Sequence, residues 1–359
     1  MRILHVITSL RTGGAEKLMV DLLPRMKECG HDVDLCVFDG ARTPFYDEIE
    51  ARGVRVVALG SSVYTPLFVL KLLRLMRHYD IVHSHNTACQ FYVAMAGLFT
   101  SCRIFTTEHN TTNRRRNGIW RLPDKWMYGR YERVVCISEQ TKQNLTAHVG
   151  DNVEHKCAVV YNGIDIEHYM SRSTAKEPSL TGKNILMVAA FRAQKDQATL
   201  VRAMALLPQD YKLRLVGGGE EALMENCKAL AHEVGVNERV EFLGVRTDVA
   251  QLLQEADVVV LSSHYEGLSL SSLEGMACGK PFVASDVEGL RDIVGGYGVL
   301  FPEGNEKELA QIIRRLCEDR NYARIVANRC VERAKLYDVR VTTQRYLALY
   351  EQIEYSRNK

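Results

Sequence analysis

The chain has 359 residues, a length that favours two domains over one, and 46% of them are hydrophobic and 25% charged, as in soluble globular proteins. The net charge of +2 is too small to indicate a protein that binds nucleic acid through its overall charge. The ten cysteines include no Cys-x-x-Cys pair, which argues against a zinc site or a disulfide framework and predicts buried thiols in a reducing compartment.

The N-terminal residues 1–10, MRILHVITSL, form the first predicted strand. Their short apolar run is interrupted by His5 and lacks a small-residue cleavage site, so it does not resemble a signal peptide. No apolar stretch reaches the roughly 18–20 residues that a membrane span needs. We therefore expect a cytoplasmic protein, and peripheral binding at the inner membrane face stays open.

Strand-like and helix-like segments then alternate along the chain. Residues 15–30 form a predicted helix that ends near Gly30, and the following strands are 32–38, 54–59, 80–85, 103–109, 133–138 and 156–163. A second series of strands covers 183–191, 211–219, 239–244, 257–262, 281–285 and 298–301. Short β-branched runs between amphipathic segments indicate parallel sheets with helices on both faces.

A polar stretch at 166–183 separates the two series and has the composition of a linker. The predicted fold class is α/β, with two doubly wound Rossmann-like domains that face a cleft. We expect the first domain at 1–165 and the second at 184–335. A C-terminal helix at 336–359 could cross back to the first domain.

Positive charge gathers between residues 70 and 133, where eleven Lys and Arg accompany four Asp and Glu. The densest part contains Trp126 and Met127 together with Arg114, Arg115, Arg116, Trp120, Arg121, Lys125 and Arg130. Two interpretations stay open. The segment is a solvated surface with one buried Trp, or it is a basic, aromatic surface that meets anionic lipid head groups or an anionic acceptor.

Ligands of open parallel sheets bind beyond the carboxyl ends of the strands, so the segment after each strand is a candidate site. Gly13 and Gly14 follow the first strand and precede a helix, an arrangement that suits a phosphate. A tight turn explains the same pair equally well. The missing G-x-G-x-x-G pattern argues against a dinucleotide site.

Two loops of the second series carry similar signals. Arg192 and Lys195 lie at the end of a strand, where two cations can neutralise a diphosphate without a metal. Exposed loop cations are the alternative. Residues 217–219 are three glycines that form a second glycine-rich turn before a helix, with the same two explanations.

The segment SSHYEGLSLSSLEGMACGKP, residues 262–281, follows a buried strand and carries Glu266 and Glu274. Ser271 and Glu274 fit the S-x-x-E capping box, so a structural role for Glu274 stays open. Glu266 lies before the predicted helix and can accept hydrogen bonds from ligand hydroxyls. Backbone amides between Gly267 and Ser272 suit phosphate oxygens. A ligand with both hydroxyls and phosphates, such as a nucleotide sugar, fits this loop.

Glu266 and Glu274 resemble the E-x7-E motif of the family 4 glycosyltransferases, which are retaining enzymes with the GT-B fold. Further stretches resemble family motifs in their usual order: GGAE at 13–16, HSHN at 83–86, TEHN at 107–110, CISE at 136–139, VYNGID at 160–165, FRAQKD at 191–196, LVGGGE at 215–220, FLG at 242–244 and EGMACGKPFVASDVEGLRDIV at 274–294. One such motif is weak evidence, whereas this ordered series over most of the chain is strong.

The resemblance implies a role for each matching residue. The first domain would lie on the acceptor side and the second would bind the nucleotide sugar. Glu274 would bind the ribose hydroxyls, Glu266 the hydroxyls of the donor sugar, and Arg192 with Lys195 the diphosphate. The expected catalytic set is His109, Glu266, Arg192 and Lys195. The other expected donor contacts are Gly13, Gly14, Gly218, Val245, Arg246, Gly267, Leu268 and Ser269.

Some of these positions keep an alternative. His109 would lie beside the donor sugar, or it is a satisfied polar residue at a strand end. Many relatives have Gly where this chain has Ser269, whose side chain could narrow the sugar pocket. Asp32 and Asp34 form a D-x-D, a pattern that metal-dependent transferases of another fold use. Here the pair alternates along a strand and is expected to be structural.

The expected activity is retaining, metal-independent transfer of a sugar from a nucleotide donor, UDP-linked in the first instance, without a cofactor. The acceptor is expected to be lipid-linked or a saccharide, in surface polysaccharide or glycolipid synthesis, and the basic segment favours a lipid-linked or otherwise anionic acceptor. Two other functions stay open: a sugar-nucleotide 2-epimerase on the same fold, and a non-catalytic nucleotide-binding protein. The many transferase-like motifs argue against the first, and the intact set of site residues argues against the second.

Overall fold

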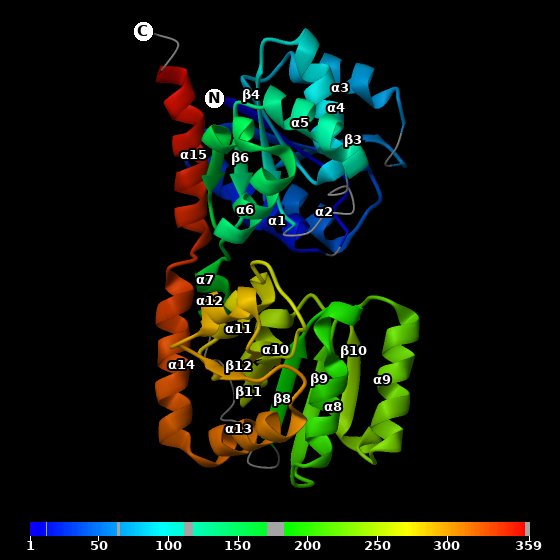
Figure 1. The fold of residues 1–359 in the computed structure, drawn as a ribbon, viewed down its shortest axis with the longest axis vertical. Coiled ribbons are helices and arrows are strands. Elements are labelled where there is room, and N and C mark those ends of the chain that lie inside the picture. The colour runs from blue at the N-terminus through cyan, green and yellow to red at the C-terminus, as the bar shows by residue number, and fades with distance from the viewer. Residues whose placement is uncertain (12, 63–64, 111–117, 171–182, 356–359) are drawn as a thin grey trace. The chain divides into compact units, whose positions relative to one another are not determined.

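The structure is a computed structural model that describes residues 1–11, 13–62, 65–110, 118–170 and 183–355 (Figure 1). The chain forms two compact units. The first comprises Met1–Gly163 with Val339–Lys359, and the second comprises Ile164–Asp338. The stretch predicted as a linker begins within a helix, α7 (Ile166–Met170), which belongs to the second unit. Residues 171–182 lie outside the described part.

The first unit contains a parallel sheet of seven strands among its described residues, in the order β3-β2-β1-β4-β5-β6-β7. Its strands are β1 (Arg2–Ile7), β2 (Asp32–Asp39), β3 (Arg55–Gly60), β4 (Ile81–His85), β5 (Arg103–Glu108), β6 (Arg133–Cys136) and β7 (Cys157–Val159). Its helices are α1 (Gly14–Glu28), α2 (Pro44–Ala51), α3 (Phe68–Met76), α4 (Thr87–Ala96), α5 (Arg121–Arg130), α6 (Glu139–Val149) and α15 (Val339–Tyr355), with 3₁₀ turns η1 (Gly97–Phe99), η2 (Gly118–Trp120) and η3 (Asp151–Lys156).

The core of this unit lies in two layers, one on each face of its sheet, because successive side chains of a strand point to opposite faces. Ile3 and Ile7 of β1 pack with α1, α2 and α15, whereas Leu4 and Val6 pack with α3, α4 and α5. Successive side chains of a strand point to opposite faces, so a run of apolar residues such as β1 fills both layers. The expected sheet with helices on both faces is confirmed.

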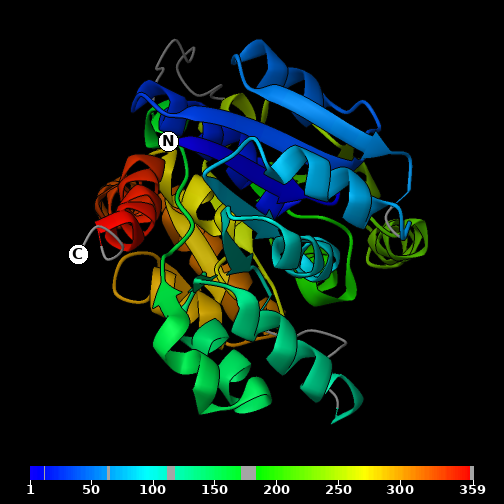
Figure 2. The same cartoon turned by 90° about the horizontal axis from the view of Figure 1, so that it is seen from above.

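The last helix, α15, belongs to the first unit and is held by buried polar contacts. His83 Nδ1 lies 2.7 Å from the Tyr350 hydroxyl, and the Thr107 and Tyr346 hydroxyls lie 2.9 Å apart. Figure 2 shows α15 (red) end on beside the blue strands of the unit. Helix α15 also packs against α1. The chain thus returns from the second unit to complete the core of the first.

The D-x-D pair has a structural explanation. Asp34 is 7% exposed and accepts hydrogen bonds from the Arg55 guanidinium and from the Tyr79 hydroxyl at 2.5 Å. Both partners lie within the first unit, so the carboxylate of Asp34 is already satisfied. For Asp34, this agrees with the expectation that the pair is structural.

The second unit has a parallel sheet of six strands in its described residues, in the order β10-β9-β8-β11-β12-β13. Its strands are β8 (Lys183–Val188), β9 (Tyr211–Val216), β10 (Val240–Gly244), β11 (Val258–Leu261), β12 (Phe282–Ser285) and β13 (Val299–Phe301). Its other helices are α8 (Gln197–Ala205), α9 (Glu221–Glu233), α10 (Val249–Glu255), α11 (Leu270–Ala277), α12 (Glu288–Val294), α13 (Glu306–Glu318) and α14 (Arg320–Lys335), with 3₁₀ turns η4 (Ala193–Lys195) and η5 (Asn237–Arg239). No helix in the described ranges is long and apolar enough to cross a membrane.

The basic segment is only partly described, because Arg114, Arg115 and Arg116 lie outside the described residues. Trp120 is 44% exposed and Trp126 is 40% exposed, so the interpretation with one buried Trp is wrong. The residue of helix α5 that fills the core is Met127, which is fully buried. Arg121 and Lys125 are exposed on the same helix.

Candidate functional site

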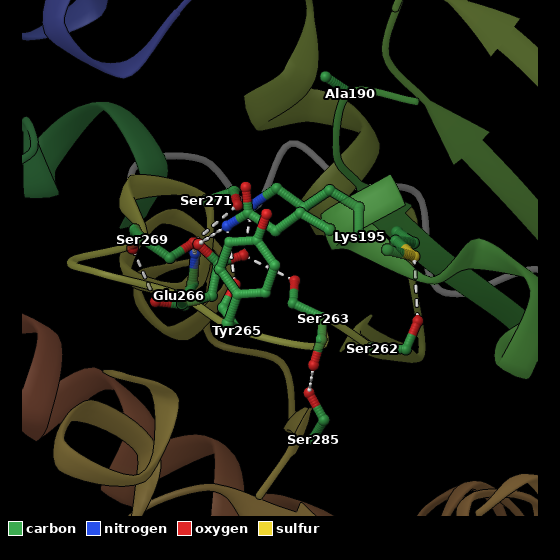
Figure 3. A network of polar contacts seen from close by, with 12 residues as sticks. Ala190, Lys195, Ser262, Ser263, Tyr265, Glu266, Ser269, Ser271 and Ser285 are labelled. Carbon is green, nitrogen blue, oxygen red and sulfur yellow. Dashed lines mark hydrogen bonds and ion pairs between the residues drawn. The ribbon is translucent and has the colours of Figure 1, made fainter. Parts of the chain in front are cut away.

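The loops after β8 and β11 meet at the carboxyl edge of the second sheet, where these two strands are neighbours. Lys195 forms an ion pair with Glu266, and the Ser263 hydroxyl donates to the same carboxylate at 2.6 Å. Gln194 Nε2 lies 3.2 Å from the other oxygen of Glu266. Figure 3 shows Lys195, Ser263 and Glu266 converging on one point. Two predicted catalytic residues are therefore brought into direct contact.

Burial makes this ion pair important for the stability of the loops that it joins. The side chain of Lys195 is 15% exposed and that of Glu266 is 6% exposed, so water screens the pair weakly. Each charge compensates the desolvation cost of the other, and each is unfavourable alone. Lys195 can serve a bound diphosphate only if it turns from Glu266 or is shared between the two anions.

Arg192 lies apart from this pair. Its side chain is exposed and, within the described ranges, has no hydrogen bond or ion pair. It lines an open groove of about 450 Å³ together with Asp196, Gln197 and Arg202. An uncommitted guanidinium at the rim of a groove is available to an incoming anion, in contrast to the paired ammonium of Lys195.

The predicted capping box is wrong, because helix α11 begins earlier than expected. Ser269 has extended backbone angles, is the N-cap residue, and accepts a hydrogen bond from the Ser272 amide at 3.4 Å. Ser271 lies inside the first turn, so Glu274 falls beyond the position from which a capping glutamate reaches back. Ser269 and Ser271 are both residues that can cap the start of a helix, and in the structure Ser269 is the N-cap.

Glu274 is instead bound by Tyr169 of helix α7. The Tyr169 hydroxyl donates to Glu274 Oε1 at 2.8 Å, and the two residues are 3% and 9% exposed. Tyr169 precedes Glu274 by 105 positions, so no local motif could reveal the pair. This hydroxyl fixes one oxygen of the carboxylate for which the family resemblance implies binding of the ribose.

The side chain of Ser269 is engaged in its own helix turn. Its hydroxyl lies 3.1 Å from the Ser271 hydroxyl and caps the Ser272 amide. The residue is 5% exposed. The departure from the Gly that many relatives have at this position therefore has a local structural use, since Ser is a better N-cap than Gly.

The glycines at 217–219 allow loops to pack closely at the ends of β8, β9 and β10. A Cβ on Gly217 would lie 2.2 Å from the Ala189 carbonyl oxygen, and one on Gly219 would lie 2.3 Å from that of Phe191. Both residues have positive φ, 145° and 146°, which only glycine adopts readily. The Gly217 amide donates to the Gly244 carbonyl and is therefore not free for phosphate.

Gly218 lies against Val245, another of the expected contacts of the donor nucleotide. A Cβ at Gly218 would meet Val245 Cγ2 at 2.8 Å, so these two predicted contacts are neighbours. Val245 is 56% exposed, which leaves its apolar surface open to a ligand. Arg246 forms a two-pronged ion pair with Asp248, at 2.8 and 2.6 Å, and its guanidinium is directed to that carboxylate.

Gly289 of helix α12 supports the Glu266 loop and was not predicted. A Cβ there would lie 2.2 Å from the Glu266 carbonyl oxygen and 2.3 Å from that of Gly267. Any other residue would push the loop away from the helix. The motif EGLRD contains this glycine, and its position at the start of the helix that follows β12 was the available signal.

In the first unit, Gly13 is the N-cap of α1 and Gly14 is its first residue. The Glu16 carboxylate folds back over this turn, and a Cβ on Gly13 would lie 2.2 Å from Glu16 Oε2. Glu16 Oε1 also lies 3.5 Å from Asn86 Nδ2. A negative charge from the same helix thus lies where the sequence predicted a phosphate, and an anionic ligand would have to displace it.

His109 lies at the carboxyl edge of the first sheet and is half-buried. Its Nε2 is 3.0 Å from His85 Nδ1, and His85 Nε2 is 2.9 Å from His5 Nδ1. Burial lowers the pKa of His109 to about 4 and that of His5 to about 3. Burial, assisted by the neighbouring imidazoles, also holds the pKa of His85 well below its ordinary value. The three rings are therefore neutral at neutral pH.

The buried ion pair generates a prediction about stability. We expect Lys195→Met to lower the free energy of unfolding by about 3 kcal/mol, because it leaves the Glu266 carboxylate buried without its counter-ion. The double variant with Glu266→Gln should recover most of this loss. Urea unfolding of the four proteins of this cycle measures both effects. Equal losses in the single and the double variant would contradict the buried-charge explanation.

Two family models match the chain one after the other. Residues 12–168 match the model described as Glycosyltransferase Family 4, and residues 172–336 match the model described as Glycosyl transferases group 1. Together they span most of the chain, in the order of the two units.

Similar proteins extend over nearly the full length. The chain is 27% identical to a Campylobacter jejuni protein named N-acetylgalactosamine-N,N'-diacetylbacillosaminyl-diphospho-undecaprenol 4-alpha-N-acetylgalactosaminyltransferase, covering 92% of this chain and 94% of the relative. It is 33% identical to the alpha-1,3-N-acetylgalactosaminyltransferase of the same organism, over 66% of this chain and 64% of the relative.

The fold matches solved structures of the same architecture. The Anabaena protein HepE, in complex with UDP and glucose, superposes with a TM-score of 0.87 at 22% identity, covering 98% of this chain and 100% of HepE. This likeness concerns the fold. Taken with the ordered motifs and the two matching family models, it shows that the chain belongs to the family 4 glycosyltransferases and has the GT-B fold.

Proposed function

We propose that this glycosyltransferase moves a sugar from a UDP-linked donor to a lipid-linked acceptor, or to a saccharide, with retention of configuration. The observation that carries the proposal is the carboxyl edge of the second sheet, where Glu266 and Glu274 are held in place by Lys195 and Tyr169. Carboxylates fixed by buried donors, with an uncommitted Arg192 on the loop that also carries Lys195, suit a ligand that has hydroxyls and a diphosphate. The relatives named for lipid-diphosphate substrates support the acceptor class.

The chemical step breaks the bond between the sugar C1 and the diphosphate oxygen. A new bond forms between C1 and the acceptor oxygen on the same face, and the acceptor proton passes to the departing phosphate. The transition state resembles an oxocarbenium ion, while negative charge grows on the diphosphate. Arg192 and Lys195 would stabilise that charge, which makes a divalent metal unnecessary in this proposal.

The two other functions that the sequence left open receive less support. The relative that aligns over 92% of this chain is named as a transferase, which favours transfer over epimerisation. A non-catalytic protein would not need the contacts that fix Glu266 and Glu274. Both carboxylates have buried hydrogen-bond partners, which argues against that alternative. Transfer therefore remains the function that the site supports best.

Surface polysaccharide or glycolipid assembly at a membrane is the proposed setting. Nine large apolar side chains between residues 67 and 126 are exposed: Leu67, Leu70, Phe91, Leu98, Phe99, Ile119, Trp120, Leu122 and Trp126. They lie on or next to α3, α4, α5, η1 and η2, and α4 packs against α3, α5 and η1. The Phe91 and Trp126 rings lie 6.3 Å apart. Exposed cations among them, such as Arg121 and Lys125, suit anionic lipid.

The activity is tested with a panel of nucleotide sugars in EDTA, by nucleotide release with and without a membrane lipid extract. We expect release from a UDP-sugar, increased by lipid and reduced at least about a hundredfold in Glu274→Ala. Activity that appears only after a divalent metal is added would contradict metal independence. An epimerised donor without transfer would support the epimerase. Anomeric analysis of the product tests retention.

The contact between Tyr169 and Glu274 predicts a selective effect on donor binding. Tyr169→Phe removes one hydrogen bond to a buried carboxylate, so we expect the donor KM to rise by roughly tenfold with little change in kcat. Tyr322→Phe, which removes a hydroxyl on α14, is the matched control. An unchanged KM in Tyr169→Phe would show that this hydroxyl does not position Glu274 for the nucleotide.

The exposed apolar surface predicts lipid binding. We expect the protein to sediment with phosphatidylglycerol vesicles, and Ile119→Ser or Leu122→Ser to weaken this binding by about tenfold each. Ile325→Ser and Leu336→Ser, which change exposed apolar residues of the second unit, should bind like the wild type. Equal binding to neutral phosphatidylcholine vesicles would contradict the role of the cations.

A further inference from the structure

The two members of the ion pair between Lys195 and Glu266 are held with unequal firmness. The Ser263 hydroxyl donates to Glu266 Oε1 at 2.6 Å, and Gln194 Nε2 lies 3.2 Å from Oε2. The same Gln194 nitrogen donates to the Tyr265 carbonyl at 2.7 Å, next to Glu266 in the chain. Figure 3 shows these contacts around the carboxylate. Glu266 is therefore fixed, and it would keep two hydrogen bonds if Lys195 left.

Lys195 is the member of the pair that can move. Within the described ranges, its ammonium forms a hydrogen bond or ion pair with Glu266 alone. Its main chain lies in the turn η4, where its amide donates to the Arg192 carbonyl at 2.8 Å. The backbone is thus anchored, whereas the four-carbon side chain can rotate.

Glu266 competes with a bound diphosphate for this ammonium. In the structure, the charge of Lys195 is balanced by the carboxylate. A nucleoside diphosphate that draws Lys195 away leaves Glu266 without its counter-ion. The Glu266 side chain is only 6% exposed, so water solvates the remaining charge poorly, and an uncompensated buried charge is strongly unfavourable. Free nucleoside diphosphate therefore binds against this penalty.

A sugar attached to the diphosphate reduces the penalty. A sugar hydroxyl can donate to Glu266, and a hydrogen bond to a charged acceptor is among the stronger ones. An intact nucleotide sugar offers a phosphate to Lys195 and a hydroxyl to Glu266, whereas the free nucleotide offers only the phosphate. The two halves of the donor should therefore bind with positive coupling.

We propose that Glu266 is a specificity-determining residue that distinguishes an intact nucleotide sugar from free nucleoside diphosphate, by holding Lys195 whenever no sugar hydroxyl replaces it. This inference rests on the proposed transfer reaction. After transfer, the sugar hydroxyls leave Glu266 with the acceptor, and Lys195 returns to the carboxylate. The same competition then promotes release of the nucleotide product.

The competition is measured by calorimetric titration in EDTA, without acceptor, using UDP, UDP-glucose and UDP-N-acetylgalactosamine. We expect the wild type to bind one of the two UDP-sugars about tenfold more tightly than UDP. Glu266→Gln frees Lys195, so this variant should bind UDP about tenfold more tightly than the wild type does. A carboxylate that only contacts the sugar would leave the UDP affinity unchanged in Glu266→Gln, and that result would overturn the proposal.

A second titration separates competition for Lys195 from simple repulsion between the carboxylate and the phosphates. In a Lys195→Met background, Glu266→Gln should have little effect on the UDP affinity. The matched control is Glu303→Gln, which removes a carboxylate bound to His264 of the same loop and should bind UDP like the wild type. An equal gain in the Lys195→Met background or in Glu303→Gln would indicate repulsion and overturn the proposal. Should Lys195→Met fail to fold, the other three proteins still decide.

The titrations also distinguish this inference from the proposed function. Sugar transfer by the wild type, with the UDP affinity unchanged in Glu266→Gln, would refute the inference alone. Tighter UDP binding by Glu266→Gln, in a protein that transfers no sugar, would support the competition and refute the transfer reaction. Failure of the wild type and Glu266→Gln to bind UDP or either UDP-sugar would refute both.

Discussion

The ion pair between Lys195 and Glu266 is the interaction on which the arrangement of the second unit's site depends. It joins the loop after β8 to the loop after β11. These two strands are neighbours in the sheet, and β9 and β10 are added on one side of them and β12 and β13 on the other. At such a switch point neighbouring loops turn away to opposite faces and leave room for a ligand. The ion pair connects these loops, and Gly289 lets α12 pack against the second of them.

The first unit repeats this topology with a different chemistry. Its switch point lies between β1 and β4, and these are the strands that supply His5 and His85. The linking contact here is a hydrogen bond between neutral rings, whereas in the second unit it is a bond between opposite charges. Full burial explains the difference. An isolated imidazolium in the core would be expensive, while Lys195 and Glu266 compensate each other near the surface.

Features that depend on neighbouring residues could be predicted from the sequence, whereas contacts between residues far apart in the chain could not. Strand positions followed from short β-branched runs, and Glu266 was singled out because it lies in a loop after a buried strand. The N-cap of α11 was misplaced because Ser269 and Ser271 both suit that role and spacing alone does not choose between them. Tyr169 was missed because its partner lies 105 positions away. His5 appeared only as an interruption of an apolar strand, although its ring faces the α15 side of the sheet.

The donors of the two sites differ in what they can do for a reaction that gains negative charge on its leaving group. In the proposed reaction, the attraction of the cations Arg192 and Lys195 to the diphosphate would strengthen as that charge develops, which is the condition for catalysis. A neutral His109 offers a directional hydrogen bond whose strength changes little with the charge on the diphosphate. The fully buried imidazoles of His5 and His85 carry no charge in the first unit, whereas the second unit retains a desolvated ion pair.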